Sequence, residues 1–392
     1  MSLAGRSLIS VRDLTTAEVD RILDLADEMA RAIGFDGPEH RTPARPLDRV
    51  LATLFFEPST RTRLSFESAM LRLGGQVLGF ADPAVSSVQK GETLADTIRM
   101  AAGYADIIVI RHPKAGAARV AAEYSSVPVI NAGDGPHEHP TQTLTDLFCI
   151  RRNHGTLTGL RVGLCGDLRY GRTVHSLAPA LARYGSEIVC IAPAPLQMPT
   201  EVLEEVTRLG GRFEQTADLA AALGKLDVLY MTRVQRERFD DPAEYEQLKS
   251  SYVLTPELLS QAPEHMSVLH PLPRVDEIAV GCDTDPRAKY FVQAAGGVPT
   301  RMALIALLLG TEDRTRCKGA FRFAEAPQEV KVGPAREPDR PRRQERVVEG
   351  VRCTNPKCIT STEAYLPPLT YEVGGELRCA YCEERSVQKG LF

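Results

Sequence analysis

The chain has 392 residues, of which 43% are hydrophobic and 25% are charged, and its net charge is −4. This length is typical of two or three domains, and the composition is ordinary for a globular protein. The near balance of charge gives no general attraction to nucleic acid or to an anionic membrane, so any anion site must be local. No signal peptide is apparent, and the longest apolar run, Met302–Leu309, is too short to span a bilayer. We therefore expect a cytoplasmic protein that binds neither nucleic acid nor membrane.

Strand-like and helix-like segments alternate from Ser7 to about Gly310. Thr15 and Glu18 form a capping box that begins a helix with one apolar face. Helical stretches separate nearly all of the short apolar runs that predict strands, which are Val50–Phe56, Ile107–Ile110, Pro128–Ile130, Arg161–Cys165, Ile188–Ala192, Val228–Met231 and Val268–Leu269. This alternation predicts an α/β protein with doubly wound parallel sheets.

The length of this alternating region favours two such domains. We expect a first domain over residues 1–150, a second over 151–297, and a helix over 298–310 that packs back on the first domain. Residues 311–349 contain four prolines and eighteen charged residues, which predicts a linker or an arm. A small cysteine-bearing module follows over residues 350–392.

Hydroxyl and guanidinium groups gather where the first predicted strand leads into a helix, at Ser59, Thr60, Arg61 and Thr62. Free backbone N–H groups at a helix N-terminus attract anions, so this segment predicts a phosphate site. Ordinary helix capping with solvated arginines is the competing interpretation.

Seven short segments in order resemble the carbamoyltransferase family. They are Ser59-Thr-Arg-Thr-Arg63, Lys90-Gly-Glu-Thr93, Arg111-His-Pro113, His139-Pro-Thr-Gln-Thr143, Gly166-Asp-Leu-Arg-Tyr-Gly-Arg-Thr173, Met231-Thr-Arg-Val-Gln235 and His270-Pro-Leu-Pro-Arg274. The resemblance implies transfer of a carbamoyl group from carbamoyl phosphate to an amine, without an organic cofactor. Such a site positions two substrates and stabilises developing negative charge.

The resemblance also implies a role for each residue. Arg61, Lys90, Arg111 and His139 are expected to be catalytic, with His139 stabilising the carbonyl oxygen. The expected contacts to carbamoyl phosphate are Ser59, Thr60, Arg61, Thr62, Ser86, Arg111, His139, Gln142, Leu272 and Pro273. In the family, the loop that contains Ser86 and Lys90 enters a neighbouring subunit's site. We therefore expect at least a trimer, with a dimer of trimers or a larger assembly left open.

Two further arginines favour L-aspartate as the acceptor. The expected aspartate contacts are Lys90, Arg172, Arg233 and Gln235, since guanidinium groups pair with carboxylates. The product would be N-carbamoyl-L-aspartate, an intermediate of pyrimidine biosynthesis. Ornithine carbamoyltransferase is the alternative within the family. The resemblance implies a His-Cys-Leu-Pro loop in that enzyme, whereas this chain has His270-Pro-Leu-Pro-Arg274 at the same place.

The C-terminal cysteines have the spacing of a zinc ribbon, Cys353-x₄-Cys358-x₂₀-Cys379-x₂-Cys382. Four thiolates leave no open position, so we expect a structural zinc. The other five cysteines are scattered and are expected to be reduced and mostly buried.

The module resembles the zinc domain of the regulatory chain of aspartate carbamoyltransferases. Residues 311–349 are too short and too polar to be the nucleotide-binding domain that accompanies it in that chain. Zinc ribbons also bind nucleic acid or protein, so a catalytically retired fold used as a zinc-ribbon binding protein remains an alternative.

Overall fold

The computed structural model describes residues 2–35, 37, 47–234, 252–312, 343–348 and 350–388. The helices are η1 (Val11–Asp13), α1 (Thr16–Ala32), α2 (Thr60–Arg72), η2 (Pro83–Val85), η3 (Ser87–Lys90), α3 (Leu94–Ala102), α4 (Ala117–Tyr124), α5 (Pro140–His154), α6 (Arg172–Ala182), η4 (Ala194–Leu196), α7 (Thr200–Arg208), α8 (Leu219–Leu223), α10 (Pro256–Leu259), η6 (Val280–Thr284), α11 (Tyr290–Leu308) and η7 (Ile359–Ser361). The strands are β1 (Val50–Phe55), β2 (Gln76–Phe80), β3 (Ile107–His112), β4 (Val129–Asp134), β5 (Arg161–Cys165), β6 (Glu187–Ile191), β7 (Arg212–Thr216), β8 (Val228–Met231), β9 (Ser267–Leu269), β10 (Arg346–Val347), β11 (Val351–Cys353), β12 (Leu369–Val373), β13 (Glu376–Cys379) and β14 (Ser386–Gln388).

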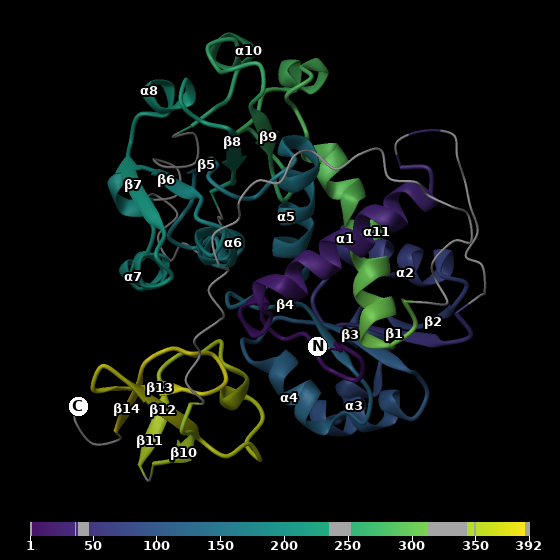
Figure 1. Ribbon diagram of the computed structural model, residues 1–392. Helices are drawn as coiled ribbons and strands as arrows, with labels where there is room; N and C mark the ends of the chain where they lie inside the picture. Colours follow the sequence, from purple (N-terminus) through teal and green to yellow (C-terminus); the bar gives the residue numbers. More distant parts are fainter. Residues whose placement is uncertain are drawn as a thin grey trace.

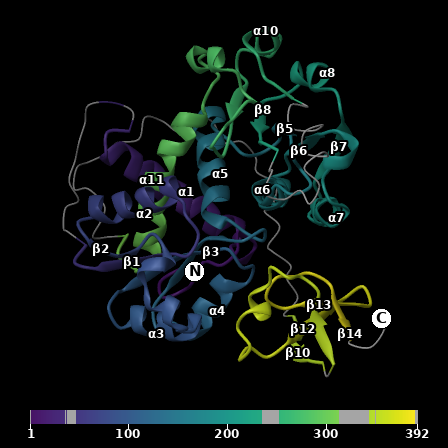
Figure 2. The same ribbon diagram turned by 180° about the vertical axis from the view of Figure 1, so that it is seen from behind.

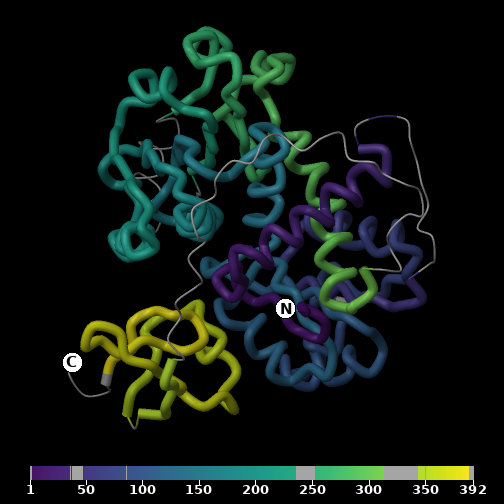
Figure 3. Tube along the Cα trace, viewed as in Figure 1, coloured from purple at the N-terminus to yellow at the C-terminus, as the bar shows by residue number. Residues whose placement is uncertain are grey.

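The first domain is built on a four-stranded parallel sheet in the order β2-β1-β3-β4. Helices cover both faces, with α1 and α2 on one side and α3 and α4 on the other (Figure 1). The N-terminal segment runs beside β4, where Leu8 forms a parallel bridge with Ile130 (Figure 3).

The second domain has a five-stranded parallel sheet in the order β7-β6-β5-β8-β9. Two parallel sheets with flanking helices agree with the predicted α/β class. Strands β2 and β7 were not predicted from the sequence. Both are edge strands with largely exposed side chains, so they lack the apolar runs that mark the central strands.

Helices α5 and α11 connect the two domains. The helix expected over 298–310 begins earlier, at Tyr290, and it packs against α1, α2 and α5. By length and composition α11 is the one described helix that would suffice to cross a membrane, but 72% of its apolar window is buried inside the protein. It is therefore a core helix of the two domains.

The C-terminal module consists of a three-stranded antiparallel sheet, β10-β12-β13, and the pair β11 and β14. Figures 1 and 2 show from opposite sides that the module lies beside α4. Its Cys358, Ile359 and Tyr381 belong to one hydrophobic cluster with residues of β3 and α4. The module is thus docked on the first domain of its own chain.

Candidate active site

A cleft of about 630 Å³ lies at the ends of strands from both sheets. Its walls include residues that follow β8 and β9, residues of the loops after β1 and β5, and Arg111 in β3. Ligands of open α/β sheets bind at the carboxyl ends of the strands, and this is where the cleft is. The predicted contacts that line it are Ser59, Thr60, Arg61, Thr62, Arg111, His139, Gln142, Arg172, Arg233, Leu272 and Pro273.

The N-terminus of α2 forms the part of the cleft suited to a phosphate. Ser59 is the N-cap residue, and its side chain makes no capping hydrogen bond. Arg61 stands in the first turn, where partial burial lowers the pKa of its guanidinium from the usual value. The first turn of α2 holds no acidic residue, so the free N–H groups face no competing carboxylate there.

Two guanidinium groups from different domains converge above Gly133. A Cβ atom at this position would lie 3.2 Å from Nη1 of Arg111 and 3.2 Å from Nη2 of Arg172. Gly133 also has a φ of 118°, a backbone conformation that other residues rarely adopt. Arg172 donates a hydrogen bond to the carbonyl oxygen of Gly135. Glycine at position 133 therefore leaves room for two cations beside one another, an arrangement that favours an anionic ligand.

Glu57 was not predicted from the sequence, although it lines the cleft. Its Oε2 lies 3.1 Å from Nε of Arg111 as an ion pair. Burial lowers the pKa of Arg111 from the usual value, although Glu57 opposes this shift. Glu57 thus offsets part of the positive charge of the cleft.

His139 is the N-cap residue of α5 and only 5% exposed. Burial, and after it the charges of Arg172, Arg111 and Arg301, hold the pKa of His139 well below its usual value. The imidazole is therefore neutral at neutral pH. A neutral imidazole retains one N–H group, which suits donation to a carbonyl oxygen that gains negative charge.

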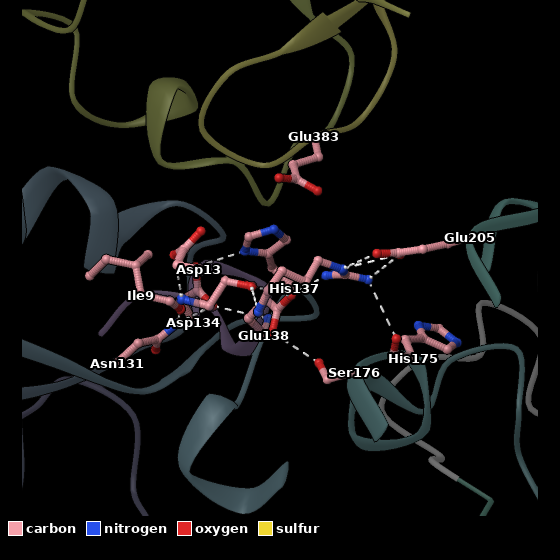
Figure 4. Close-up of polar contacts among 12 residues, drawn as sticks. Ile9, Asp13, Asn131, Asp134, His137, Glu138, His175, Ser176, Glu205 and Glu383 are labelled. Atoms are coloured by element: carbon pink, nitrogen blue, oxygen red, sulfur yellow. Dashed lines mark hydrogen bonds and ion pairs between the residues drawn. The ribbon is translucent and has the colours of Figure 1, made fainter. Parts of the chain in front are cut away.

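The loop that precedes His139 is held by a buried polar network (Figure 4). Asp134 accepts hydrogen bonds from Asn131 Nδ2, Gly116 N and Glu138 N at 2.9 to 3.0 Å, and His137 Nδ1 lies 3.0 Å away. Asp134 is 1% exposed, so these contacts fix the turn of the chain that leads to His139.

Arg12 connects this loop to the second domain. It forms an ion pair with Glu138, and its Nε and Nη2 both donate to Glu205 of α7 at 2.9 Å. Glu138 also accepts from Ser10 at 3.1 Å and from Ser176 of α6 at 2.9 Å. Glu383 of the C-terminal module points toward His137 in Figure 4. The loop is therefore in contact with both domains and faces the module.

The segment His270–Pro273 is shaped by a buried histidine. His270 Nε2 lies 2.6 Å from Glu277, and its Nδ1 accepts from the backbone N–H of Leu272 at 2.7 Å. Leu272 has a φ of 54°, which is unusual for a residue with a branched side chain. This rare conformation is maintained at the wall of the cleft, where strained backbone is typical of functional sites.

Arg301 is a second cleft residue that was not predicted. It is 4% exposed, its guanidinium lies 4.9 Å from the ring centroid of Phe66, and burial lowers its pKa to about 10. Two of the predicted contacts do not line the cleft. Ser86 is the cap residue between η2 and η3, and Lys90 ends η3. A third predicted contact, Gln235, lies outside the described residues.

The four clustered cysteines bring their sulfur atoms within 4.8 Å of one another. The Cys353–Cys382 and Cys358–Cys379 sulfur pairs are 3.4 Å and 3.8 Å apart. A tetrahedral zinc with bonds of about 2.3 Å requires sulfur atoms about 3.8 Å apart, so the donor set fits zinc. Asn355 N and Thr360 Oγ1 donate to Cys353 and Cys358 sulfur at 3.4 Å and 3.2 Å, as expected around a negatively charged thiolate site.

Comparison with known proteins places the chain in a family. The aspartate/ornithine carbamoyltransferase carbamoyl-P binding domain matches residues 6–152, and the Asp/Orn binding domain of the same family matches residues 158–308. The metal binding domain of the aspartate carbamoyltransferase regulatory chain matches residues 345–390. The chain belongs to the aspartate/ornithine carbamoyltransferase family.

Similar proteins include aspartate carbamoyltransferases of several organisms. The aspartate carbamoyltransferase catalytic subunits of Thermococcus onnurineus and Methanopyrus kandleri are each 53% identical over 310 residues, which is 79% of this chain and 99% of theirs. The solved catalytic subunit of M. jannaschii aspartate transcarbamoylase has 47% identity and a TM-score of 0.72, and the match covers 79% of this chain and 99% of that one. Aspartate transcarbamoylase from Trypanosoma cruzi, solved with carbamoyl phosphate and aspartate, has 40% identity and a TM-score of 0.72 over 78% and 98% of the two chains.

Proposed function

We infer that the chain transfers the carbamoyl group of carbamoyl phosphate to L-aspartate, giving N-carbamoyl-L-aspartate and phosphate. The observation that carries this inference is the cleft in which Arg61, Arg111, Arg172 and Arg233 converge from two domains. A phosphate dianion and a dicarboxylate suit a cleft in which these guanidinium groups outnumber the one carboxylate among its described lining residues, Glu57.

Each group has a task in the reaction that its surroundings support. The N-terminus of α2 and Arg61 bind the phosphate and stabilise the charge that grows on the leaving oxygen. His139 and Arg111 donate to the carbonyl oxygen as the amine attacks. Arg172 and Arg233 bind the carboxylates of aspartate and so orient its amine. No covalent intermediate is needed, because positioning and charge stabilisation suffice.

We propose zinc as the metal of the C-terminal module, held by Cys353, Cys358, Cys379 and Cys382. The sulfur geometry and the all-thiolate donor set support zinc over harder cations, which prefer oxygen ligands. The site has no open position for a substrate, so its role is structural. A cytoplasmic location agrees with the buried free thiols Cys149, Cys165, Cys190 and Cys282.

We also propose a homotrimer. Apolar side chains stand exposed on α2, β2 and α3, namely Leu64, Leu71, Leu78 and Met100, at 37% to 61% exposure. Large apolar side chains that stand exposed on these elements favour a protein contact. Lys90 and Ser86 follow β2 and do not line the cleft of their own chain, so contact with a second copy would bring them into its cleft.

The function is tested by a carbamoylation assay that offers aspartate and ornithine side by side with carbamoyl phosphate. We expect turnover of aspartate and none of ornithine. Comparable turnover of ornithine would assign the chain to the other branch of the family, and turnover of neither would support the retired-fold alternative.

A further inference from the structure

One cation of the cleft comes from outside the two carbamoyltransferase domains. Lys357 belongs to the C-terminal module, and it lines the cleft together with Pro113 and Gly135. Among the described residues that line the cleft, the others lie between positions 57 and 301. The module therefore contributes to the wall of the cleft in its own chain.

The backbone at Lys357 is fixed to the first domain. Ala115 N donates to the carbonyl oxygen of Lys357 at 2.9 Å, and Ile359 N donates to the carbonyl oxygen of Ala115 at 2.9 Å. Lys357 N also donates to the side chain of Asn355 at 2.8 Å. These bonds hold the backbone of Lys357 against Ala115, which follows Arg111 by four residues and lies just beyond the carboxyl end of β3.

A second lysine at the contact between the module and the first domain makes different interactions. Lys114 does not line the cleft, and its Nζ donates to Pro356 O and to Ser361 Oγ of the module, both at 3.3 Å. Lys357 forms no ion pair with another residue of the described ranges. Lys114 thus serves docking of the module, whereas the charge of Lys357 remains available to the cleft.

Lys357 lies near the part of the cleft where Arg172 is held, since a Cβ atom at Gly135 would lie 3.1 Å from the nitrogen of Ala115, which donates to Lys357. Gly135, its neighbour in the wall, is the residue whose carbonyl oxygen accepts the hydrogen bond from Arg172. The charged residues of the lining are Glu57 against Arg61, Arg111, Arg172, Arg233, Arg301 and Lys357. A flexible, hydrated lysine at an entrance attracts an approaching anion without holding it rigidly.

We propose that Lys357 of the zinc module is a substrate-attracting residue of the active site in its own chain, and that it acts on the dicarboxylate acceptor. This proposal rests on the proposed function. The fused module would thereby contribute directly to substrate capture, in addition to its structural role.

The test compares Lys357→Gln and Lys357→Glu with wild type by steady-state kinetics, with aspartate varied at saturating carbamoyl phosphate. At low ionic strength, kcat/KM for aspartate should fall about threefold to tenfold in the neutral variant and further in the acidic one, while kcat stays within about twofold. The differences should shrink towards 1 M salt, where charges are screened within about 3 Å. Lys357→Arg should restore the wild-type value.

Lys114→Gln is the matched control, because it removes a charge from the same contact between the module and the first domain but not from the cleft. It should leave kcat/KM unchanged at every salt concentration. Equal losses of kcat/KM in Lys114→Gln and Lys357→Gln, or a loss that salt does not diminish, would overturn the proposal. Either result would attribute the loss to weaker docking of the module. Unchanged kinetics in Lys357→Gln, or faster loss of zinc with intact kcat/KM, would overturn it as well. A wild type that does not use aspartate would instead refute the proposed function.

Discussion

Replacing Arg12 with Met should loosen the loop that presents His139. The side chain of Glu138 is 1% exposed, whereas those of Arg12 and Glu205 are each 19% exposed. Burial opposes the charge of Arg12, yet Glu138 and Glu205 raise its pKa above the usual value, so the guanidinium is firmly held. Without it, Glu138 is a buried carboxylate whose described side-chain hydrogen bonds come from two serine hydroxyls.

The magnitude follows from this burial. Removing one partner of a buried ion pair costs about 3–5 kcal/mol, and the two remaining serine bonds place Arg12→Met near about 3 kcal/mol. Glu205→Gln removes a partly exposed partner and should cost about 1 kcal/mol or less. The double variant Arg12→Met with Glu138→Gln leaves no buried carboxylate without its cation, so its cost should fall below that of Arg12→Met alone.

Native-state hydrogen exchange measures this effect where it occurs. About 3 kcal/mol corresponds to roughly a hundredfold faster exchange of amides in residues 134–139 of Arg12→Met. Local exchange is preferable to global unfolding, because a chain with several domains does not unfold in one step. Additive losses in the double variant, or equal effects of Arg12→Met and Glu205→Gln, would refute the reasoning.

Three other expectations concern the metal, the assembly and pH. Purified protein should contain one zinc per chain, and Cys379→Ser should lose the metal and expose residues 343–388 to protease; protein without zinc would contradict the assignment. Lys90→Ala and Arg61→Ala should each be inactive alone, and subunit exchange between them should restore roughly a quarter of wild-type activity, since one interface in four combines an intact loop and an intact cleft. Exchange without recovery would mean that Lys90 acts in its own chain. Burial lowers the pKa of His175 to about 4, so the unfolded state binds the proton at a higher pH than the folded state does. The free energy of unfolding should therefore decrease as pH falls below about 6.5, by up to about 3 kcal/mol near pH 4. The thermal midpoint of His175→Gln should therefore fall less between pH 6.5 and 4 than that of wild type, and parallel curves would exclude His175 as the cause.

The sequence predicts the central strands well because burial makes them continuous apolar runs. Arg161–Cys165 and Val228–Met231 are strands over the same residues in the structure. The start of α11 was placed too late because Gly296, Gly297 and Pro299 are typical helix breakers. Glycine at position 297 leaves room for the buried Arg301, since a Cβ there would lie 2.1 Å from Nη1 of Arg301. Tertiary packing thus overrides local preference in this helix.

The sequence predicts those cleft residues that belong to recognisable short motifs, and it misses those that do not. Arg301 was missed because a single arginine in an apolar helix has no signal of its own until the fold buries it beside Phe66. Lys357 was missed for a different reason. The zinc spacing predicts a module but not the surface on which it docks, and it is docking that brings Lys357 to the cleft.

The central claim is that guanidinium groups of the cleft select a dicarboxylate acceptor. The most direct measurement is kcat/KM for aspartate in wild type and in Arg233→Ala, with ornithine as the comparison substrate. Wild type should use aspartate alone, and Arg233→Ala should lose about 2–5 kcal/mol of transition-state binding, which is a fall in kcat/KM of about thirtyfold or more. An Arg233→Ala variant that keeps wild-type kcat/KM for aspartate, or a wild type that carbamoylates ornithine comparably, would contradict the central claim.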